Sequence, residues 1–251
     1  MPLLEIAGLT KNFGGVSATS GLDLFVERGE IHAVIGPNGA GKTTVINQLT
    51  GELDCDAGRI VFAGSDITTM PIYARTRLGL ARSYQITQVF RDLSVLQNMV
   101  IAAQARLAHS FQFWSPAVRD PRFAKPVRNA LDRVGLTDRM FAPVAVLAHG
   151  ELRQLELAMT LVLDPKLLVL DEPTAGMSPA ETERVVRLLG SLKGPYSILL
   201  VEHDMDAVFK LADRITVLVN GRAIASGSIA DIRADPAVRE AYLGDDESED
   251  W

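Results

Sequence analysis

The stretch IHAVIGPNGAGKTT, residues 31–44, constrains the fold of this chain more than any other feature. Its first part is nearly all apolar, as a buried central strand is, and it runs directly into a glycine-rich loop and a predicted helix through Thr50. The loop, residues 36–43, matches G-x-x-x-x-G-K-[ST] between a strand and a helix, the context in which this pattern binds phosphate. The stretch therefore predicts an α/β fold with a phosphate site at the end of a central strand.

The residue types of this loop suit the β- and γ-phosphates of a nucleotide. Glycine lets the backbone curl so that N–H groups face phosphate oxygens, Lys42 neutralises their charge, and the Thr43 hydroxyl can ligate Mg²⁺. A glycine-rich turn without a ligand is the alternative. The residues predicted to contact the nucleotide are Gly36, Pro37, Asn38, Gly39, Ala40, Gly41, Lys42, Thr43 and Thr44.

Two adjacent carboxylates follow a second apolar strand, in LLVLDE at residues 167–172. Asp171 is placed to emerge toward the metal, and Glu172 to orient or deprotonate an attacking water. A plain surface loop is the alternative, and the phosphate loop makes it the weaker one. Because the sequence has no NKxD-type guanine-reading motif, the two features together predict an ATP hydrolase rather than a GTP hydrolase.

Composition sets the outer limits of this prediction. The chain has 251 residues, of which 47% are hydrophobic and 22% charged, which fits one large α/β domain or two smaller lobes. Cys55 cannot form an internal disulfide, so we expect a reducing compartment. The first residues lack the plan of a signal peptide, and no apolar run approaches the ~20 residues of a membrane span. A membrane role would therefore need a partner.

The charge is unevenly distributed. The net charge is −6, and five of the acidic residues lie in the tail 245–251, which we expect to be disordered. Without them the charge is −1, which argues against a nucleic-acid footprint. Residues 106–139 instead carry +4, either as a solvated helical face or as a surface near anionic lipid or a partner.

A helical insertion divides the predicted α/β segments. Strands are expected at 3–9, 22–29, 31–36, 59–64, 165–173 and 196–204, and Asn220-Gly221 predicts a hairpin within 214–227. Helical patterns fill residues 87–160, with interruptions expected at Pro116, Pro121, Pro126 and Pro143. The predicted division is a nucleotide-binding core with a β subdomain (1–86 and 161–227), a helical subdomain (87–160), C-terminal helices (228–244) and the tail (245–251).

These pieces, in this order, resemble the ATP-binding cassette family over nearly the whole chain. Gln85 in ARSYQITQVF resembles the loop glutamine that senses metal and partner, and LLVEHD supplies the family's switch histidine, His203. Phe13 in LTKNFGG stands where the family stacks an aromatic ring on adenine. The resemblance implies a P-loop NTPase with the ABC ATPase fold, namely a RecA-like core, an antiparallel β subdomain and an inserted α-helical subdomain. It also implies catalytic roles for Glu172, His203 and Gln85, and metal ligation by Thr43, Gln85 and Asp171.

The stretch LAHGE, residues 147–151, resembles the family signature LSGGQ at the start of a helix. In this family two cassettes face head to tail, so the resemblance implies that Ala148, His149, Gly150 and Glu151 close over ATP held by a partner subunit. Gly150 would let the helix N-terminus approach the γ-phosphate. Ala148 lacks the hydroxyl of a serine, and His149 replaces a glycine. The imidazole either points away from phosphate or adds a pH-dependent contact.

The segment DEPTAGMSP, residues 171–179, resembles the dimer loop but also departs from the family pattern. Where many cassettes carry aspartate before proline, this chain has Ser178-Pro179. With Glu181 these residues predict a capping box, so the helix start is preserved. An aspartate-mediated contact across the dimer is in doubt.

Within the family, LARSYQ, FRDLSVLQNM, LDRVGL and the ending RADPAVREAYLG look most like the ATP-binding subunits of branched-chain amino acid importers. A lipopolysaccharide export cassette is the closest rival, and a soluble cassette switch on ribosomes or DNA and a nucleotide-binding regulator without turnover are further alternatives. The resemblance implies ATP and Mg²⁺ as cofactors and a peripheral place on the cytoplasmic face of the cell membrane. The implied partners are an identical or paralogous second cassette, transmembrane permease subunits and, indirectly, a periplasmic or extracellular binding protein.

The segment 86–93 is expected to contact a membrane subunit, because a loop that touches both the metal and that subunit can couple the two sites. The alternative is that Val89, Phe90 and Leu93 are simply core of the helical lobe. The cargo is left open among leucine, another amino acid, urea and an aromatic acid.

Overall fold

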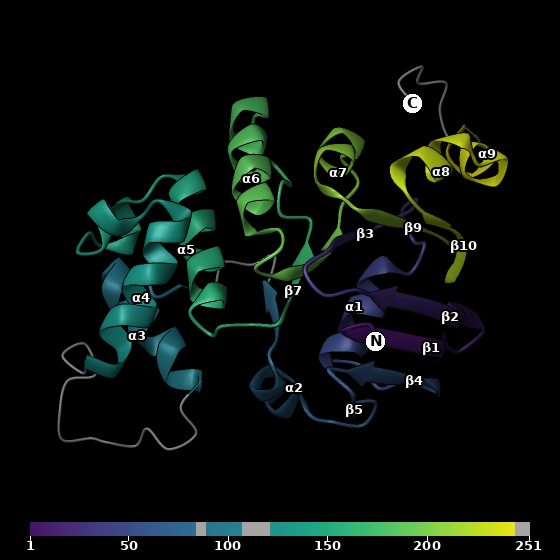
Figure 1. Ribbon diagram of the computed structural model, residues 1–251, viewed down its shortest axis with the longest axis horizontal. Helices are drawn as coiled ribbons and strands as arrows, with labels where there is room; N and C mark the ends of the chain where they lie inside the picture. The colour runs from purple at the N-terminus through teal and green to yellow at the C-terminus, as the bar shows by residue number, and fades with distance from the viewer. Residues whose placement is uncertain (84–88, 107–120, 244–251) are drawn as a thin grey trace. The chain divides into compact units, whose positions relative to one another are not determined.

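The computed structural model describes residues 1–83, 89–106 and 121–243. The chain forms two compact units, one made of Met1–Leu80 and Lys166–Trp251 and the other of Ala81–Pro165 (Figure 1). The insertion expected at 87–160 thus lies within the second unit. Among the described residues no helix is long and apolar enough to span a membrane.

The central sheet of the first unit has six strands in the order β10-β9-β3-β8-β7-β6. Its parallel strands are β7 (Leu167–Asp171), β8 (Ser197–Val201), β3 (Ile31–Ile35) and β9 (Arg214–Val219), paired in that order. All residues of β3, β7 and β8 are buried, because a parallel sheet is covered on both faces. The apolar runs of the sequence therefore predicted these strands correctly.

Two further strands complete this sheet. β10 (Arg222–Gly227) pairs with β9 in antiparallel fashion, and β6 (Leu80–Ser83) begins at the boundary of the unit. The β9–β10 turn has positive φ at both Asn220 (48°) and Gly221 (75°). Both signs match a type I′ turn, which confirms the predicted hairpin.

A second, antiparallel sheet has the order β2-β1-β4-β5, formed by β1 (Leu4–Phe13), β2 (Val16–Val26), β4 (Ala57–Phe62) and β5 (Ser65–Asp66). Its buried face shares one core with α1 (Lys42–Thr50). The strands predicted at 3–9 and 22–29 were too short at the ends that face each other, because β1 and β2 continue to the hairpin where Phe13 pairs with Val16. Polar residues at the exposed end of this ribbon hide the strand pattern but leave the backbone ladder intact.

The remaining helices of the first unit are α2 (Ile72–Leu78), α6 (Pro179–Leu192), α7 (Met205–Leu211), α8 (Ile229–Ala234) and α9 (Pro236–Leu243). Ile232 of α8 and Val238 of α9 share a core with β9, so the expected C-terminal helices close over the edge of the central sheet. At the start of α6, Glu181 accepts bonds from the N–H and the hydroxyl of Ser178 (3.0 and 2.6 Å). The glutamate half of the predicted capping box is present.

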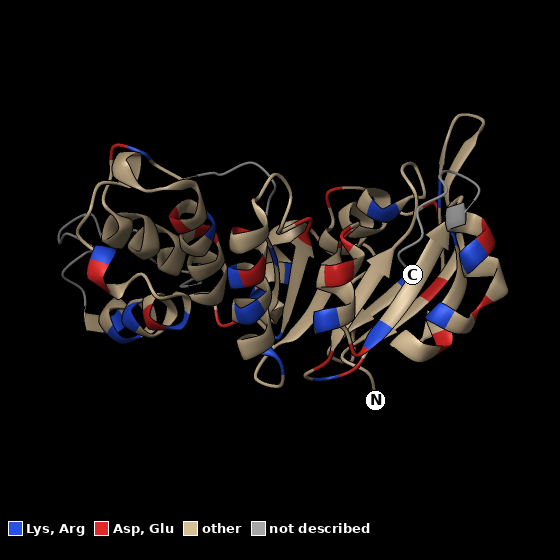
Figure 2. Cartoon of the chain, turned by 90° about the horizontal axis from the view of Figure 1, so that it is seen from above, with Lys and Arg blue, Asp and Glu red and all other residues tan. Residues whose placement is uncertain are grey.

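The second unit contains α3 (Val95–Arg106), α4 (Pro121–Val134) and α5 (His149–Leu161), with single 3-10 turns at Thr137–Arg139 and Val144–Val146. The expected break at Pro126 is wrong, because this proline lies inside α4. Pro126 comes early in the helix and costs one backbone hydrogen bond, while Phe123, Val127 and Leu131 are buried on the face that holds the helix in place. Figure 2 shows acidic and basic residues interspersed on most of the helices.

Candidate active site

The loop that the sequence predicts to bind phosphate, residues 36–43, lies between β3 and α1 and is packed against the backbone of two other strands. Gly36 and Gly41 have φ angles of 152° and 102°. A Cβ atom at these positions would lie 2.1 Å and 2.2 Å from backbone oxygens of β9 and β2. Gly221, in the β9–β10 turn, donates its N–H to Ala40 O (2.9 Å). Only glycine fits Gly36 and Gly41, so backbone packing itself fixes the shape of the loop.

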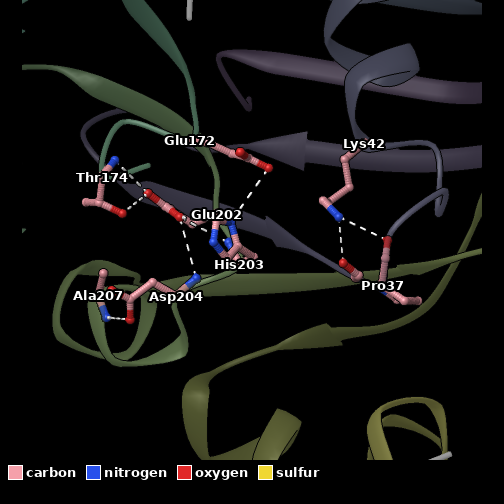
Figure 3. A network of polar contacts seen from close by, with 9 residues as sticks. Pro37, Lys42, Glu172, Thr174, Glu202, His203, Asp204 and Ala207 are labelled. Carbon is pink, nitrogen blue, oxygen red and sulfur yellow. Dashed lines mark hydrogen bonds and ion pairs between the residues drawn. The ribbon is translucent and has the colours of Figure 1, made fainter. Parts of the chain in front are cut away.

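The Lys42 side chain curls back over this loop. Its Nζ donates to Gly36 O (2.6 Å) and Pro37 O (3.0 Å), as Figure 3 shows. Burial lowers the pKa of the ammonium, and the negative charges of Glu172 and Asp171 act in the opposite direction. The two predicted carboxylates are thus close enough to the loop for their charges to act on the lysine. The Thr43 side chain is exposed at the start of α1, where its hydroxyl is accessible to a ligand.

The two carboxylates lie at the end of β7. Asp171 is its last residue and is buried, and Glu172 follows with a φ of 47°. The Glu172 N–H donates to Val201 O (2.8 Å), which ties this point to the end of β8. A residue other than glycine in the left-handed region is held there by its surroundings and is common at functional sites.

His203 follows β8 and faces Glu172. Its Nδ1 lies 3.6 Å from Glu172 Oε1 and 3.8 Å from Glu202 Oε2 (Figure 3). The imidazole is exposed, whereas the Glu202 carboxylate beneath it is completely buried. Because β7 and β8 are adjacent and parallel, their ends bring the predicted glutamate and histidine together.

Glu202 is a further residue of this site to which no sequence motif pointed. Its carboxylate accepts hydrogen bonds from the backbone and hydroxyl of Thr174 and from the N–H groups of His203 and Asp204. A glutamate directly after the apolar run at residues 198–201 was a possible signal, but its Thr174 partner is 28 residues away in the chain.

The other predicted site residues are placed as follows. Phe13 lies at the end of β1, is 52% exposed and has the Lys11 ammonium 5.9 Å from its ring centre. The ring therefore offers a free face at the tip of the β1–β2 hairpin. Gln85 lies outside the described residues, as do residues 86–88 and the tail.

The signature residues belong to the second unit and form the start of α5, as expected. Ala148 is its N-cap, with extended backbone, and the exposed His149 is its first residue. Glu151 Oε2 accepts the N–H of Ala148 (2.9 Å), and its other oxygen pairs with Arg139 (2.9 Å). The Ala148 N–H lowers the pKa of the Glu151 carboxyl, and Arg139 adds to this effect.

Comparison with known proteins places this site in a family. Residues 19–175 match the model of the ABC transporter family, and residues 224–248 match a model described as branched-chain amino acid ATP-binding cassette transporter. The chain is 36% identical to the high-affinity branched-chain amino acid transport ATP-binding protein BraF of Pseudomonas aeruginosa, over 97% of this chain and 98% of that protein. It is 37% identical to LivG of Escherichia coli, with the same coverage. LivG of Archaeoglobus fulgidus, described as a probable protein of this kind, is 37% identical over 99% and 98%.

The comparison with solved structures leads to the same family as the comparison of sequences. The ADP conformation of an ATP-binding cassette of an ABC transporter superposes with a TM-score of 0.86 at 29% identity, over 97% of this chain and 99% of that one. A nucleotide-free cassette gives 0.84 at 28%, over 96% and 99%. The chain therefore belongs to the ABC transporter family, as one of its ATP-binding, ATP-hydrolysing subunits.

Proposed function

We propose that this subunit powers the import of branched-chain amino acids, or of a closely related small solute, through separate membrane subunits. Its support is the near-complete coverage of relatives that are themselves named for branched-chain amino acid transport. The match at residues 224–248 points the same way, since it falls on the C-terminal segment that looked importer-like in the sequence. Relatives of this kind favour the importer over a lipopolysaccharide exporter or a soluble switch.

The site residues have distinct roles in this proposal. Phe13 stacks on adenine, and residues 36–44 hold the phosphates, with Lys42 leaving the loop carbonyls to meet them. Glu172 orients or deprotonates the attacking water, and His203 contacts the γ-phosphate. The main support for these roles is the distance of 3.6 Å between His203 Nδ1 and Glu172 Oε1, next to the loop that holds Lys42.

A magnesium ion fits the donor set at this site. The described residues hold no group of three or more His, Cys, Asp or Glu side chains suited to a metal ion. A cation here would therefore need nucleotide phosphate oxygens, together with the hydroxyl of Thr43, the carboxylate of Asp171 and Gln85. Mg²⁺ would supply charge neutralisation between the β- and γ-phosphates.

Each working site would be completed by a second subunit, identical or paralogous. Ala148, His149, Gly150 and Glu151 at the start of α5 would close over ATP that the partner holds. The exposure of Ala148 and His149 fits such a surface. Ser178 lacks the carboxylate that many cassettes have in the dimer loop, so this part of the interface would rest on other contacts.

The membrane subunits would dock on the second unit around Phe90, in the predicted segment 86–93. The side chains of Phe90 and Val146 are both more than half exposed. Ala145 N donates to Arg91 O (3.1 Å), so the backbone brings Val146 close to Phe90. Exposed apolar clusters of this kind mark interaction surfaces. For Phe90 the exposure argues against the alternative that it is core, and the subunit would be peripheral on the cytoplasmic face of the membrane.

Uptake and turnover test this function together. The full complex, reconstituted in vesicles with its membrane subunits and binding protein, should accumulate leucine, isoleucine or valine in an ATP-dependent manner. Glu172→Gln should lower turnover at least ~10²-fold while ATP binding persists, because water activation is lost and the phosphate loop is intact. Near-normal hydrolysis by this variant would remove Glu172 from its role. ATP-dependent uptake of urea or an aromatic acid, but of none of the three amino acids, would overturn the proposed cargo.

A further inference from the structure

A buried polar contact network outside the nucleotide loop is centred on Glu202. Its side chain is completely buried, directly after the apolar strand β8. Four donors surround the carboxylate: the N–H (3.0 Å) and hydroxyl of Thr174, and the N–H groups of His203 (3.0 Å) and Asp204 (3.5 Å). A buried charge is tolerated only with such partners, so the network is a built feature of the site.

Each carboxylate oxygen serves a different segment of the chain. Oε1 accepts both bonds from Thr174, which lies two residues after Glu172, and Oε2 accepts both bonds from the segment of His203. Figure 3 shows Glu202 between these two segments. One rigid carboxylate therefore joins the chain just after the proposed water-orienting glutamate to the chain that carries the switch histidine.

We propose that Glu202 is a positioning residue that sets the approach of His203 to Glu172. The proposal rests on the roles proposed for these two residues. Glu202 does not take part in the chemistry itself, because its side chain is shielded from solvent and both oxygens are engaged by donors. It acts on the geometry, in which a displacement of about 1 Å can cost ~10²-fold in rate.

The donor pattern requires a carboxylate rather than an amide. All four partners are used as donors, so the NH₂ group of a glutamine would face at least one N–H donor. The amide would leave a buried donor unsatisfied on one of the two segments and push that segment away. Glu202→Gln therefore changes the network without a large change in volume.

The test compares kcat and KM for ATP in the full-length chain. Glu202→Gln should lower kcat about 10- to 100-fold and change KM less than about twofold, since the phosphate loop is untouched. Thr174→Val removes a single donor and should lower kcat by a smaller factor than Glu202→Gln does. Thr174→Ser keeps the hydroxyl, so its kcat should be close to that of the parent. Parental kcat in both Glu202→Gln and Thr174→Val would overturn the proposal.

A control and a double-mutant cycle separate positioning from general damage to the fold. Thr216→Val removes another buried hydroxyl, bonded to His32 Nε2 (2.8 Å), and should lower stability while kcat is kept. If Glu202 acts through His203, then Glu202→Gln should cost much less in a His203→Ala background than in the parent. If Glu202→Gln lowered kcat by the same factor in the His203→Ala background as in the parent, the positioning role would be overturned. Failure of the proposed function would appear separately, as normal turnover in His203→Ala and Glu172→Gln themselves.

Discussion

The two units each present a helix N-terminus that the proposed function assigns to ATP phosphates, and the two are built differently. Helix α1 begins after Gly41, which has a φ of 102° and is packed against the backbone of β2. Its first residue is Lys42, and its first turn has no acidic residue. Helix α5 begins after Ala148 in extended conformation, and Glu151 in its first turn accepts the Ala148 N–H.

The difference indicates which end can bind ATP without help. A helix N-terminus favours anions, and a cation in the first turn adds to this preference while a carboxylate opposes it. The α1 end is therefore suited to hold ATP within one chain. The α5 end, with its carboxylate, would reach phosphate only when the partner brings its own lysine and metal. We infer that ATP binds first at α1 and that α5 joins on dimerisation.

The same substitution at the two ends should give opposite stability changes, and the largest effect is expected at α1. In Gly41→Ala the new Cβ would lie 2.2 Å from Ala18 O at a left-handed φ. We expect a loss of about 1–3 kcal/mol in unfolding free energy from the backbone strain alone, and loss of detectable ATP binding. Denaturant unfolding and fluorescent-ATP titration measure the two effects.

Gly64→Ala is the matched control for this variant. Gly64 has a φ of 81°, but nothing lies within 4 Å of the new Cβ. Gly64→Ala should therefore have the same backbone strain as Gly41→Ala but keep the parental affinity for ATP. Normal ATP binding by Gly41→Ala would show that the loop is not fixed by this contact, and would remove the contrast between the two ends.

At α5 the substitution of glycine by alanine should change the unfolding free energy less than at α1, and in the opposite direction. Gly150 lies within the first turn of α5, where alanine is the better helix former. Gly150→Ala should therefore raise the unfolding free energy by up to about 1 kcal/mol. ATP binding to one chain should be unchanged, while ATP-driven dimerisation weakens about tenfold, because the backbone of α5 can no longer approach phosphate closely. Dimerisation by light scattering at parental strength would contradict this.

The exposed ring of His149, the first residue of α5, can either contact the partner's phosphate or turn to solvent. If the ring donated a hydrogen bond to that phosphate, ATP-driven dimerisation should be weaker in His149→Gly than in the parent. We expect equal dimerisation of the two proteins by light scattering, because the backbone of α5 suffices for the phosphate.

Much of the first unit could be predicted because its signals are local. The loop at residues 36–43, the buried strands and the Asn220-Gly221 turn are each specified by neighbouring residues, and the structure confirms them. The α5 start was also correct, since a glycine and a polar residue precede a helical apolar pattern.

What escaped prediction depends on contacts between distant segments. Glu202 bonds to Thr174, which lies 28 residues away in the chain, and Phe13 is in a strand because Val16 pairs with it. Pro126 was expected to interrupt the helical pattern, but packing in the second unit outweighs one lost hydrogen bond. In all three cases contacts with other segments of the chain decided the outcome.

The smallest expected change in unfolding free energy concerns the carboxylate that distinguishes α5 from α1. The Glu151 carboxyl accepts the Ala148 N–H and pairs with Arg139, and both lower its pKa from 4.5. A lowered folded-state pKa means that the contribution is fully present above about 4.5 and is lost as pH falls through the folded value. Glu151→Gln should therefore cost about 0.5 kcal/mol at pH 7, a value kept small because the ion pair with the exposed Arg139 side chain lies at the surface. The difference between variant and parent should shrink as pH falls below about 4.5, as followed by urea unfolding across pH. The amide also removes the opposing charge from the helix end, so ATP-driven dimerisation should strengthen slightly. A weaker dimer would show that the negative charge helps rather than opposes phosphate, and would reverse the contrast drawn between the two helices.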